Sequence, residues 1–329
     1  NKIQEGIKLG QVLVNKNKVK PSYKVKAGDS IEVEILRAIK PTEIKPENID
    51  LDILYEDQEL LIVNKPAGMV VHPSAGHESG TLVNAVLFHC QLPPMRVLSG
   101  NQRAREKTDG DEADSSLIFA NPADFPDTII RPGIVHRLDK GTTGLMVVAK
   151  DPFTHAGLCD QFAARTVRRR YLALVIGAPN PLSGRVSAPI GRDPSDRLRM
   201  GVVHGAGGRH AASNFSVRTS LARGNAALVE WQLETGRTHQ IRVHTKEIGH
   251  PILGDDTYGG GGRSAAERLH RKGAMSLDRA KMILQKCSRP MLHARTLGFQ
   301  HPVTGEELDF AVEPPEDFAT IFQLLNDDK

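Results

Sequence analysis

Apolar residues along this chain follow two spacings, and each spacing predicts a different kind of element. Alternation or short unbroken apolar runs predict strands at residues 60–63 (LLIV), 145–149 (LMVVA), 171–177 (YLALVIG), 209–221 and 225–234. Helical spacing marks residues 81–90, which follow a candidate cap at Thr81, and also residues 152–170, 235–249 and 264–286. Because strands outnumber strand–helix–strand units, the sequence predicts an α+β fold with a large, mainly antiparallel mixed sheet.

Two local features of this pattern lead to specific expectations. The run LLIV, a turn at Pro66 to Gly68 and the apolar residues 69–72 (MVVH) predict a pair of neighbouring strands. Residues 292–318 predict further strands followed by a tail that prolines interrupt.

The pattern also divides the chain into parts. Residues 1–36 contain two short strand patterns with turns and a run of lysines, and they are too few to bury a core of their own. Residues 37–51 contain Pro41 and Pro46 and predict an extended linker. Residues 52–329 form the main domain, which a polar stretch without periodicity interrupts at about 99–128; this stretch predicts a flexible surface insertion.

Composition narrows the class of protein. Cys90, Cys159 and Cys287 lie far apart without a C-x-x-C pair, which indicates neither a disulfide framework nor a zinc module. No run of 18 apolar residues is present, so we expect no membrane span. The formal net charge is only +4, but residues 131–170 hold eight Lys or Arg against three Asp. A basic cluster of this kind favours a phosphate-bearing polymer as partner.

One acid stands inside that basic cluster. In residues 133–150 (GIVHRLDKGTTGLMVVAK), Asp139 lies among His136, Arg137 and Lys140, just before a glycine-bounded turn and a buried strand. The common role for such an Asp is a cap or a surface ion pair. Here neighbouring cations favour the charged carboxylate, which suits nucleophilic attack or stabilisation of a sugar carbon.

A second cluster occupies residues 235–244 (TGRTHQIRVH). His239, His244 and His250 suggest a metal site, but their spacings of five and six differ from the i, i+4 pair of a zinc helix, and no obvious acidic or Cys ligand joins them. The Arg242 guanidinium is better suited to a fixed grip on a carboxylate, and we expect it to pair with Asp139.

Tyr171 opens an apolar strand directly after Arg168, Arg169 and Arg170. A Tyr at this position is most often a packing residue. Beside a cationic run it also suits stacking on a base or proton transfer at a ring carbon.

These motifs together resemble one family. The segments GIVHRLDKGTTGLMVVAK, RRYLALV, TGRTHQIRVH and GHPILGDDTYGG, in this order, are similar to the RluA-type RNA pseudouridine synthases of the RluD branch. The similarity extends from about Asp52 to the C-terminal region and resembles plant and algal organellar members most. Residues 1–36 resemble part of an S4 RNA-binding module that lacks its opening helix.

The resemblance implies roles for particular residues. Asp139 would attack C1′ of a uridine or assist departure of its base, Tyr171 would contact the base and accept the proton at C5, and Arg242 would pair with Asp139. The remaining polar residues of the motifs would contact substrate RNA: His136, Arg137, Lys140, Arg168, Arg169, Arg170, Arg237, His239 and Gln240.

The resemblance further implies an isomerase that uses no metal and no cofactor. We expect a monomer acting on RNA, large-subunit rRNA before tRNA, and a plastid location before mitochondrion or cytoplasm. Two other functions fit the same residues: a non-catalytic RNA-binding ribosome-assembly factor, and a nucleoside or glycoside hydrolase.

Overall fold

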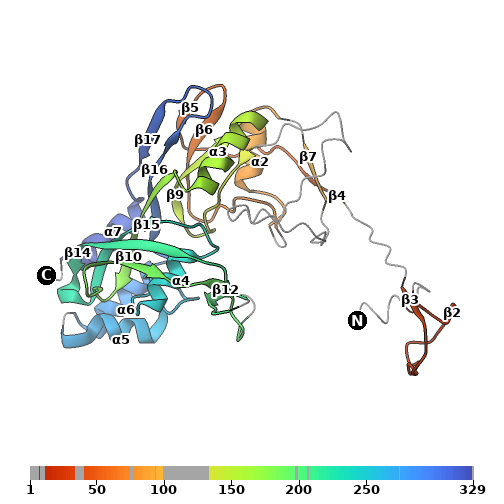
Figure 1. The fold of residues 1–329 in the computed structure, drawn as a ribbon. Helices are drawn as coiled ribbons and strands as arrows, with labels where there is room; N and C mark the ends of the chain where they lie inside the picture. The colour runs from red at the N-terminus through yellow and green to blue at the C-terminus, as the bar shows by residue number, and fades with distance from the viewer. Residues whose placement is uncertain are drawn as a thin grey trace. The chain divides into compact units, whose positions relative to one another are not determined.

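The computed structural model describes residues 7, 12–33, 41–74, 77–92, 94–98, 133–196, 199–205, 207–273 and 275–327. The chain divides into two compact units, a smaller one that includes residues 1–42 and a larger one that includes residues 121–329 (Figure 1). The insertion predicted at 99–128 lies outside the described residues.

The smaller unit contains a three-stranded antiparallel sheet in which β1 (Val12–Val14) pairs with β2 (Asn17–Lys18) and with β3 (Ile31–Val33). Asn15 and Lys16 connect β1 to β2 with positive φ at both positions, which is the two-residue hairpin turn that fits the twist of the strands. The strands and turns predicted here are therefore confirmed.

The larger unit is built on a ten-stranded sheet in the order β11-β14-β15-β10-β16-β9-β6-β5, with β17 beside β16 and β8 beside β9. Its strands are β5 (Ile53–Glu56), β6 (Leu60–Lys65), β8 (Gly133–Ile134), β9 (Thr143–Ala149), β10 (Arg168–Ile176), β11 (Ser183–Ser187), β14 (Ala212–Leu221), β15 (Ala226–Leu233), β16 (Leu292–Gln300) and β17 (Glu307–Ala311). Strand β9 runs parallel to β16 and antiparallel to β6 and β8. The predicted fold class, a mainly antiparallel mixed sheet with helices, is confirmed.

Short strands stand apart from this sheet. β12 (Ile190–Arg192) and β13 (Met200–Val202) form an antiparallel hairpin, and β4 (Pro41–Ile44) and β7 (Met95–Leu98) are also outside the main sheet.

Helices pack against the large sheet at two places (Figure 1). They are α2 (Leu82–His89), α3 (Pro152–Ala164), α4 (Gln240–Glu247), α5 (Gly262–His270), α6 (Leu277–Lys286) and α7 (Glu316–Asn326), with 3-10 turns η2 (Ala222–Gly224) and η3 (Arg271–Gly273). Leu158 and Phe162 of α3 contribute to a core with β6 and β9. Ala265, Ile283 and Phe318 of α5, α6 and α7 belong to the core around β10 and β15. The cap predicted at Thr81 is confirmed, because its side chain accepts a hydrogen bond from the Asn84 backbone.

Three expectations for secondary structure are wrong in detail. Residues 69–72 form no strand, because the carbonyls of Val70 and Val71 accept hydrogen bonds from the first turn of α2 instead of from a neighbouring strand. The helix expected over 152–170 ends at Ala164, and β10 already begins at Arg168. The C-terminal region continues into α7, which begins directly after Pro315 and carries Glu316 and Asp317 in its first turn, where acidic side chains favour a helix start.

Candidate active site

Asp139 lies in a turn that leads from β8 into β9. The backbone N–H of Thr142 donates to the carbonyl of Asp139 at 3.0 Å, which closes the turn. Leu138 before it is buried, and every residue of β9 is buried. The turn is therefore fixed to the core while the Asp139 side chain remains 19% exposed.

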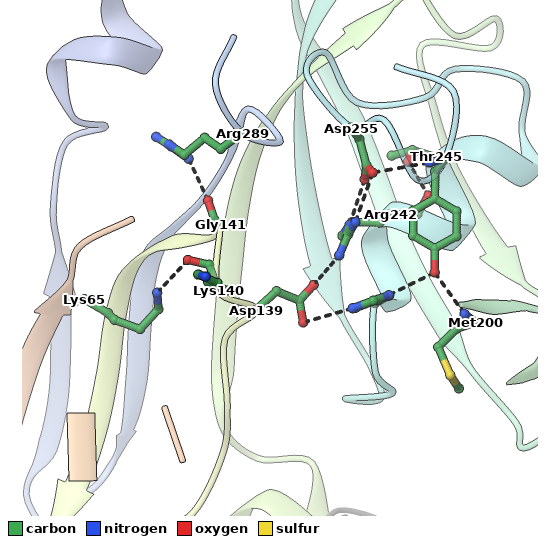
Figure 2. Close-up of polar contacts among 11 residues, drawn as sticks. Lys65, Asp139, Lys140, Gly141, Met200, Arg242, Thr245, Asp255 and Arg289 are labelled. Carbon is green, nitrogen blue, oxygen red and sulfur yellow. Dashed lines mark hydrogen bonds and ion pairs between the residues drawn. The ribbon is translucent and has the colours of Figure 1, made fainter. Parts of the chain in front are cut away.

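Two buried cations contact carbonyls of this turn (Figure 2). Nζ of Lys65 donates to the carbonyls of Pro66 and Met69 at 2.9 Å and lies 3.5 Å from that of Lys140. Nη1 of Arg289 donates to the carbonyl of Gly141 at 3.1 Å. Because these donors come from β6 and from the loop before β16, the turn is held to both neighbouring strands.

The environment of Lys65 is unusual for an ammonium group. Burial lowers its pKa to about 8, while the negative charge of Asp139 acts in the opposite direction. Arg289 is held by Asp317, whose carboxylate accepts from Nε at 2.6 Å and from Nη2 at 2.8 Å. Sequence reasoning missed both cations; the only signal was a Lys at the end of the apolar run LLIV.

Arg242 of α4 joins two carboxylates (Figure 2). Its Nη1 donates to Oδ2 of Asp139 at 3.2 Å, so the ion pair predicted between these residues is confirmed. Its Nε and Nη2 donate to the two oxygens of Asp255 at 2.7 and 3.0 Å. Burial opposes the charge of Arg242, but the hydrogen bonds to Asp255 and the charge of Asp139 outweigh it and raise its pKa.

Asp255 was not predicted as a site residue. It is 1% exposed, and its own backbone is tied into the 252–260 loop by hydrogen bonds from its N–H to Ile252 and from Gly260 to its carbonyl. The usable signal was indirect: a buried Arg needs a carboxylate partner, and the glycine-rich loop GDDTYGG supplies one.

His239 and Tyr258 complete the surroundings of Asp139. Nε2 of His239 lies 3.8 Å from Oδ1 of Asp139, and its Nδ1 lies 2.9 Å from the Tyr258 hydroxyl. The backbone N–H of Met200 in β13 donates to the same hydroxyl at 3.2 Å. The Tyr258 ring also lies against the guanidinium of Arg242, 5.0 Å from its central carbon.

Tyr171 lies on β10, two strands from the one that follows Asp139. It is 6% exposed and stands opposite Ala294 of β16, which in turn stands opposite Gly144 of β9. Two strand spacings, about 10 Å, therefore separate its backbone from the strand that follows Asp139. A register shift between Arg170 and Tyr171 interrupts the ladder here, and such bulges redirect side chains.

The cations predicted to bind RNA occupy different positions. Arg137 and Lys140 are exposed beside Asp139. Arg168 donates to Glu307 and Asp309 of β17, and Arg170 lies 3.5 Å from Glu230 of β15. Nε of Arg237 donates to the carbonyl of His210.

Three of the residues expected to contact RNA make contacts within the protein. The His136 ring stacks on Phe162, its Nε2 accepts from the Val147 backbone, and burial lowers its pKa to about 3. Arg169 is 6% exposed and its guanidinium lies over the same Phe162 ring. The Gln240 amide is 3% exposed, accepts from Thr235 and Arg237, and donates to Ala212 and Ser213. Arg169 on β10 and Gln240 on α4 are buried, and His136 lies in the segment between β8 and β9.

The three histidines considered as metal ligands each have different hydrogen-bond partners. His244 has Ser213 and Ala188 as partners, and His250 has the carbonyl of Ile176.

No helix in the described part of the chain is long and apolar enough to cross a membrane.

Comparison with known proteins adds to this geometry. The family model for RNA pseudouridylate synthases matches residues 59–247, and the S4 domain model matches residues 1–31. RNA pseudouridine synthase 2, chloroplastic, from Oryza sativa subsp. japonica is 48% identical over 339 residues, which cover 99% of this chain and 76% of that protein. Ribosomal large subunit pseudouridine synthase D from Zymomonas mobilis subsp. mobilis is 40% identical over 305 residues, covering 93% of this chain and 82% of that protein.

A solved structure shares the fold. Human RNA Pseudouridylate Synthase Domain Containing 4 aligns with a TM-score of 0.53 and 25% identity, covering 83% of this chain and 92% of that one.

Proposed function

Since this chain belongs to the RNA pseudouridylate synthase family, we propose that it isomerises specific uridines of large-subunit ribosomal RNA, with Asp139 as the catalytic carboxylate. The observation that carries the proposal is the placement of Asp139. Its carboxylate is partly open to solvent, one oxygen is held by Arg242, and the turn beneath it is clamped by Lys65 and Arg289. A carboxylate placed in this way suits a reaction at a sugar carbon.

The reaction breaks the bond from C1′ to N1 and forms one from C1′ to C5 of the same base. In one route a carboxylate oxygen of Asp139 bonds to C1′ and is released when C5 attacks; in the other the carboxylate assists departure of the base without a covalent bond. C5 loses a proton and N1 gains one, so the isomerisation needs no oxidant, and we propose that it proceeds without cofactor or metal. Tyr171 is the proposed acceptor of the C5 proton. Its register partner on β16, Ala294, is itself paired with Gly144 of β9, the strand that follows the Asp139 turn.

Access to C1′ requires the uridine to leave its stack. Extrusion of a nucleotide costs a few kcal/mol, which contacts to phosphates must offset. Arg137 and Lys140 are exposed on either side of Asp139 and are the proposed first contacts for those phosphates.

The proposal for substrate and compartment follows the relatives. One is named a ribosomal large subunit pseudouridine synthase and another a chloroplastic enzyme. We therefore propose large-subunit rRNA of a plastid as substrate, and a monomer as the acting form.

The test is isomerisation of unmodified organellar rRNA by the purified protein, with pseudouridine mapped by carbodiimide-blocked reverse transcription. Asp139→Asn keeps the shape of the side chain and removes its charge, so we expect no stops and RNA affinity within a few-fold of the parent. Asp160→Asn makes the same chemical change on an exposed position of α3 and should leave the stops unchanged.

Stops that persist in Asp139→Asn would refute the assignment of the carboxylate. Tight binding of rRNA without stops from the parent protein would favour an RNA-binding assembly factor, and release of free uracil would favour a hydrolase.

A further inference from the structure

The two oxygens of the Asp139 carboxylate are held unequally. Arg242 uses its bidentate edge, Nε and Nη2, for Asp255, and only Nη1 remains for Oδ2 of Asp139. The torsion that orients an Asp carboxylate is broad, so a single donor does not fix the plane of the group. A reaction at C1′ needs one oxygen in a defined place, and a second contact must therefore act on Oδ1.

His239 is the side chain that faces that second oxygen. Its Nε2 lies 3.8 Å from Oδ1 of Asp139, and its other ring nitrogen is held by the Tyr258 hydroxyl at 2.9 Å. The backbone of His239 is left-handed, with φ 58°, at the residue that caps the start of α4. A side chain other than glycine in this conformation is strained, and such strain is typical of functional positions.

The bonds around Tyr258 favour one of the two tautomers of His239. The Tyr258 oxygen accepts from the Met200 backbone N–H. Burial raises the pKa of Tyr258 to about 12, so the hydroxyl keeps its proton. Nδ1 of His239 is placed to accept a hydrogen bond from this hydroxyl. Nε2 then bears the ring proton and directs it toward Asp139.

We propose that His239, held by Tyr258 and through it by the β12–β13 hairpin, is a positioning residue that orients the second carboxylate oxygen of Asp139 for the isomerisation. The inference rests on the proposed function and deepens it. The contact is longer than a hydrogen bond in this structure, and a small rotation of the carboxylate closes it when the nucleotide is bound.

A neutral imidazole suits this task better than another cation. Burial, together with Arg242 and Arg137, lowers the pKa of His239, while Asp139 and Asp255 act in the opposite direction. The ring therefore orients the carboxylate by one N–H without neutralising the charge that the reaction uses.

Two substitutions at one position separate positioning from folding. The amide nitrogen of Gln reaches the place of Nε2, whereas that of Asn reaches only the place of Nδ1. Asn tolerates the left-handed backbone better than Gln, so a purely structural role predicts that His239→Asn is the milder change. Our proposal predicts the reverse: His239→Gln keeps the single-turnover rate within about tenfold of the parent, and His239→Asn loses about 100-fold, with RNA affinity unchanged in both.

A His239→Asn rate equal to or above that of His239→Gln would overturn the proposal. Thermal unfolding of both variants shows whether folding contributes to the difference.

A second measurement does not depend on turnover. In 15N spectra of histidine-labelled full-length protein, with the His239 signals assigned from their loss in His239→Gln, Nε2 should be protonated and Nδ1 should be an acceptor. Tyr258→Phe keeps the ring on Arg242 but removes the hydroxyl, and it should change the 15N chemical shifts of both His239 ring nitrogens. Asp139→Asn should change the 15N chemical shift of Nε2.

A protonated Nδ1, a cationic ring at neutral pH, or Nε2 unaffected by Asp139→Asn would overturn the contact. Absence of pseudouridine from the parent protein on every RNA would refute the proposed function alone, because the spectra still decide whether His239 addresses Asp139.

Discussion

His136 shows how a residue near Asp139 in the sequence can pack inside the protein. Three positions before Asp139, its ring lies between Phe162 and the Val147 backbone, and burial with the nearby Arg169 lowers its pKa to about 3. In the unfolded chain a His titrates near 6.5. Below that pH the unfolded state takes up a proton that the folded state refuses until about pH 3. The contribution of His136 to the free energy of unfolding is therefore fully present above pH 6.5 and falls as the pH drops toward 3.

The substitution His136→Gln tests this pH dependence, because the Gln carbonyl can accept a hydrogen bond from the Val147 backbone but does not titrate. At pH 7 the parent should be the more stable protein, and by pH 5 its advantage should shrink by about 1 to 2 kcal/mol. Urea unfolding of both proteins at the two pH values measures the change. RNA affinity should be the same in both, and an advantage that grows toward pH 5 would show that the ring is not buried in the neutral form.

The residues that sequence reasoning found and missed differ in one physical respect. Asp139 and Arg242 stand out because each carries a charge in an apolar or helical context along the chain. Asp255, Lys65 and Arg289 are recognised only when distant segments come together, because their function is to pair with a charge or a carbonyl that lies elsewhere in the sequence. Neighbouring positions in the chain do not encode such a partner.

At the scale of elements, the close contact between β9 and β16 depends on one glycine. Gly144 has φ +112°, and a Cβ there would lie 2.2 Å from the carbonyl oxygen of Ala294. These strands form the parallel pair of the sheet, and the contact stands between the Asp139 turn and Tyr171. A side chain at 144 would have to push the strands apart.

We therefore predict that Gly144→Ala lowers the unfolding midpoint by more than 5 °C and reduces the single-turnover rate at least about tenfold, since overpacking costs about 1–3 kcal/mol in addition to the backbone strain. The control is Gly249→Ala, which shares a positive φ of +82° but has nothing within 4 Å of the added Cβ. It carries the backbone strain without the clash and should keep full activity. Equal effects of the two substitutions would remove the strand contact from the explanation.

The elements themselves were predictable where burial produces the pattern. Strands β14 and β15 alternate because one face of each is more buried, and both were located from the sequence. Residues 69–72 are apolar for another reason: they cover the start of α2 without joining a ladder. Arg168 to Arg170 read as the end of a helix because arginine favours helices, yet pairing with β15 and β16 places them in a strand.

At the scale of the whole molecule, the resemblance of the motifs identified the family and the fold, whereas the local pattern identified only the fold class. Motifs far apart in the sequence converge on one carboxylate: residues 133–150 supply Asp139, residues 235–244 supply Arg242 and His239, and the loop at 252–260 supplies Asp255. Periodicity describes each element separately, so it cannot indicate this convergence.

The S4-like unit contributes charge at a distance from the carboxylate in the sequence. Lys18 and Lys20 are exposed on its short sheet and the segment that follows. Each lysine that contacts a phosphate releases a counterion, and the slope of log affinity against log salt changes by about 0.7 to 0.9 per contact. Replacing both by Gln should weaken rRNA binding and make the salt dependence shallower by about 1 to 2, while the rate at saturating RNA stays the same.

A matched pair of substitutions separates local contacts from net charge. Lys281→Gln with Lys286→Gln removes the same two charges from exposed positions of α6. Net charge acts at long range and would change the two double variants alike, whereas phosphate contacts by the S4-like unit change only the first. Filter binding over a series of salt concentrations gives both slopes, and identical slopes for the two double variants would mean that Lys18 and Lys20 contact no phosphate in the complex.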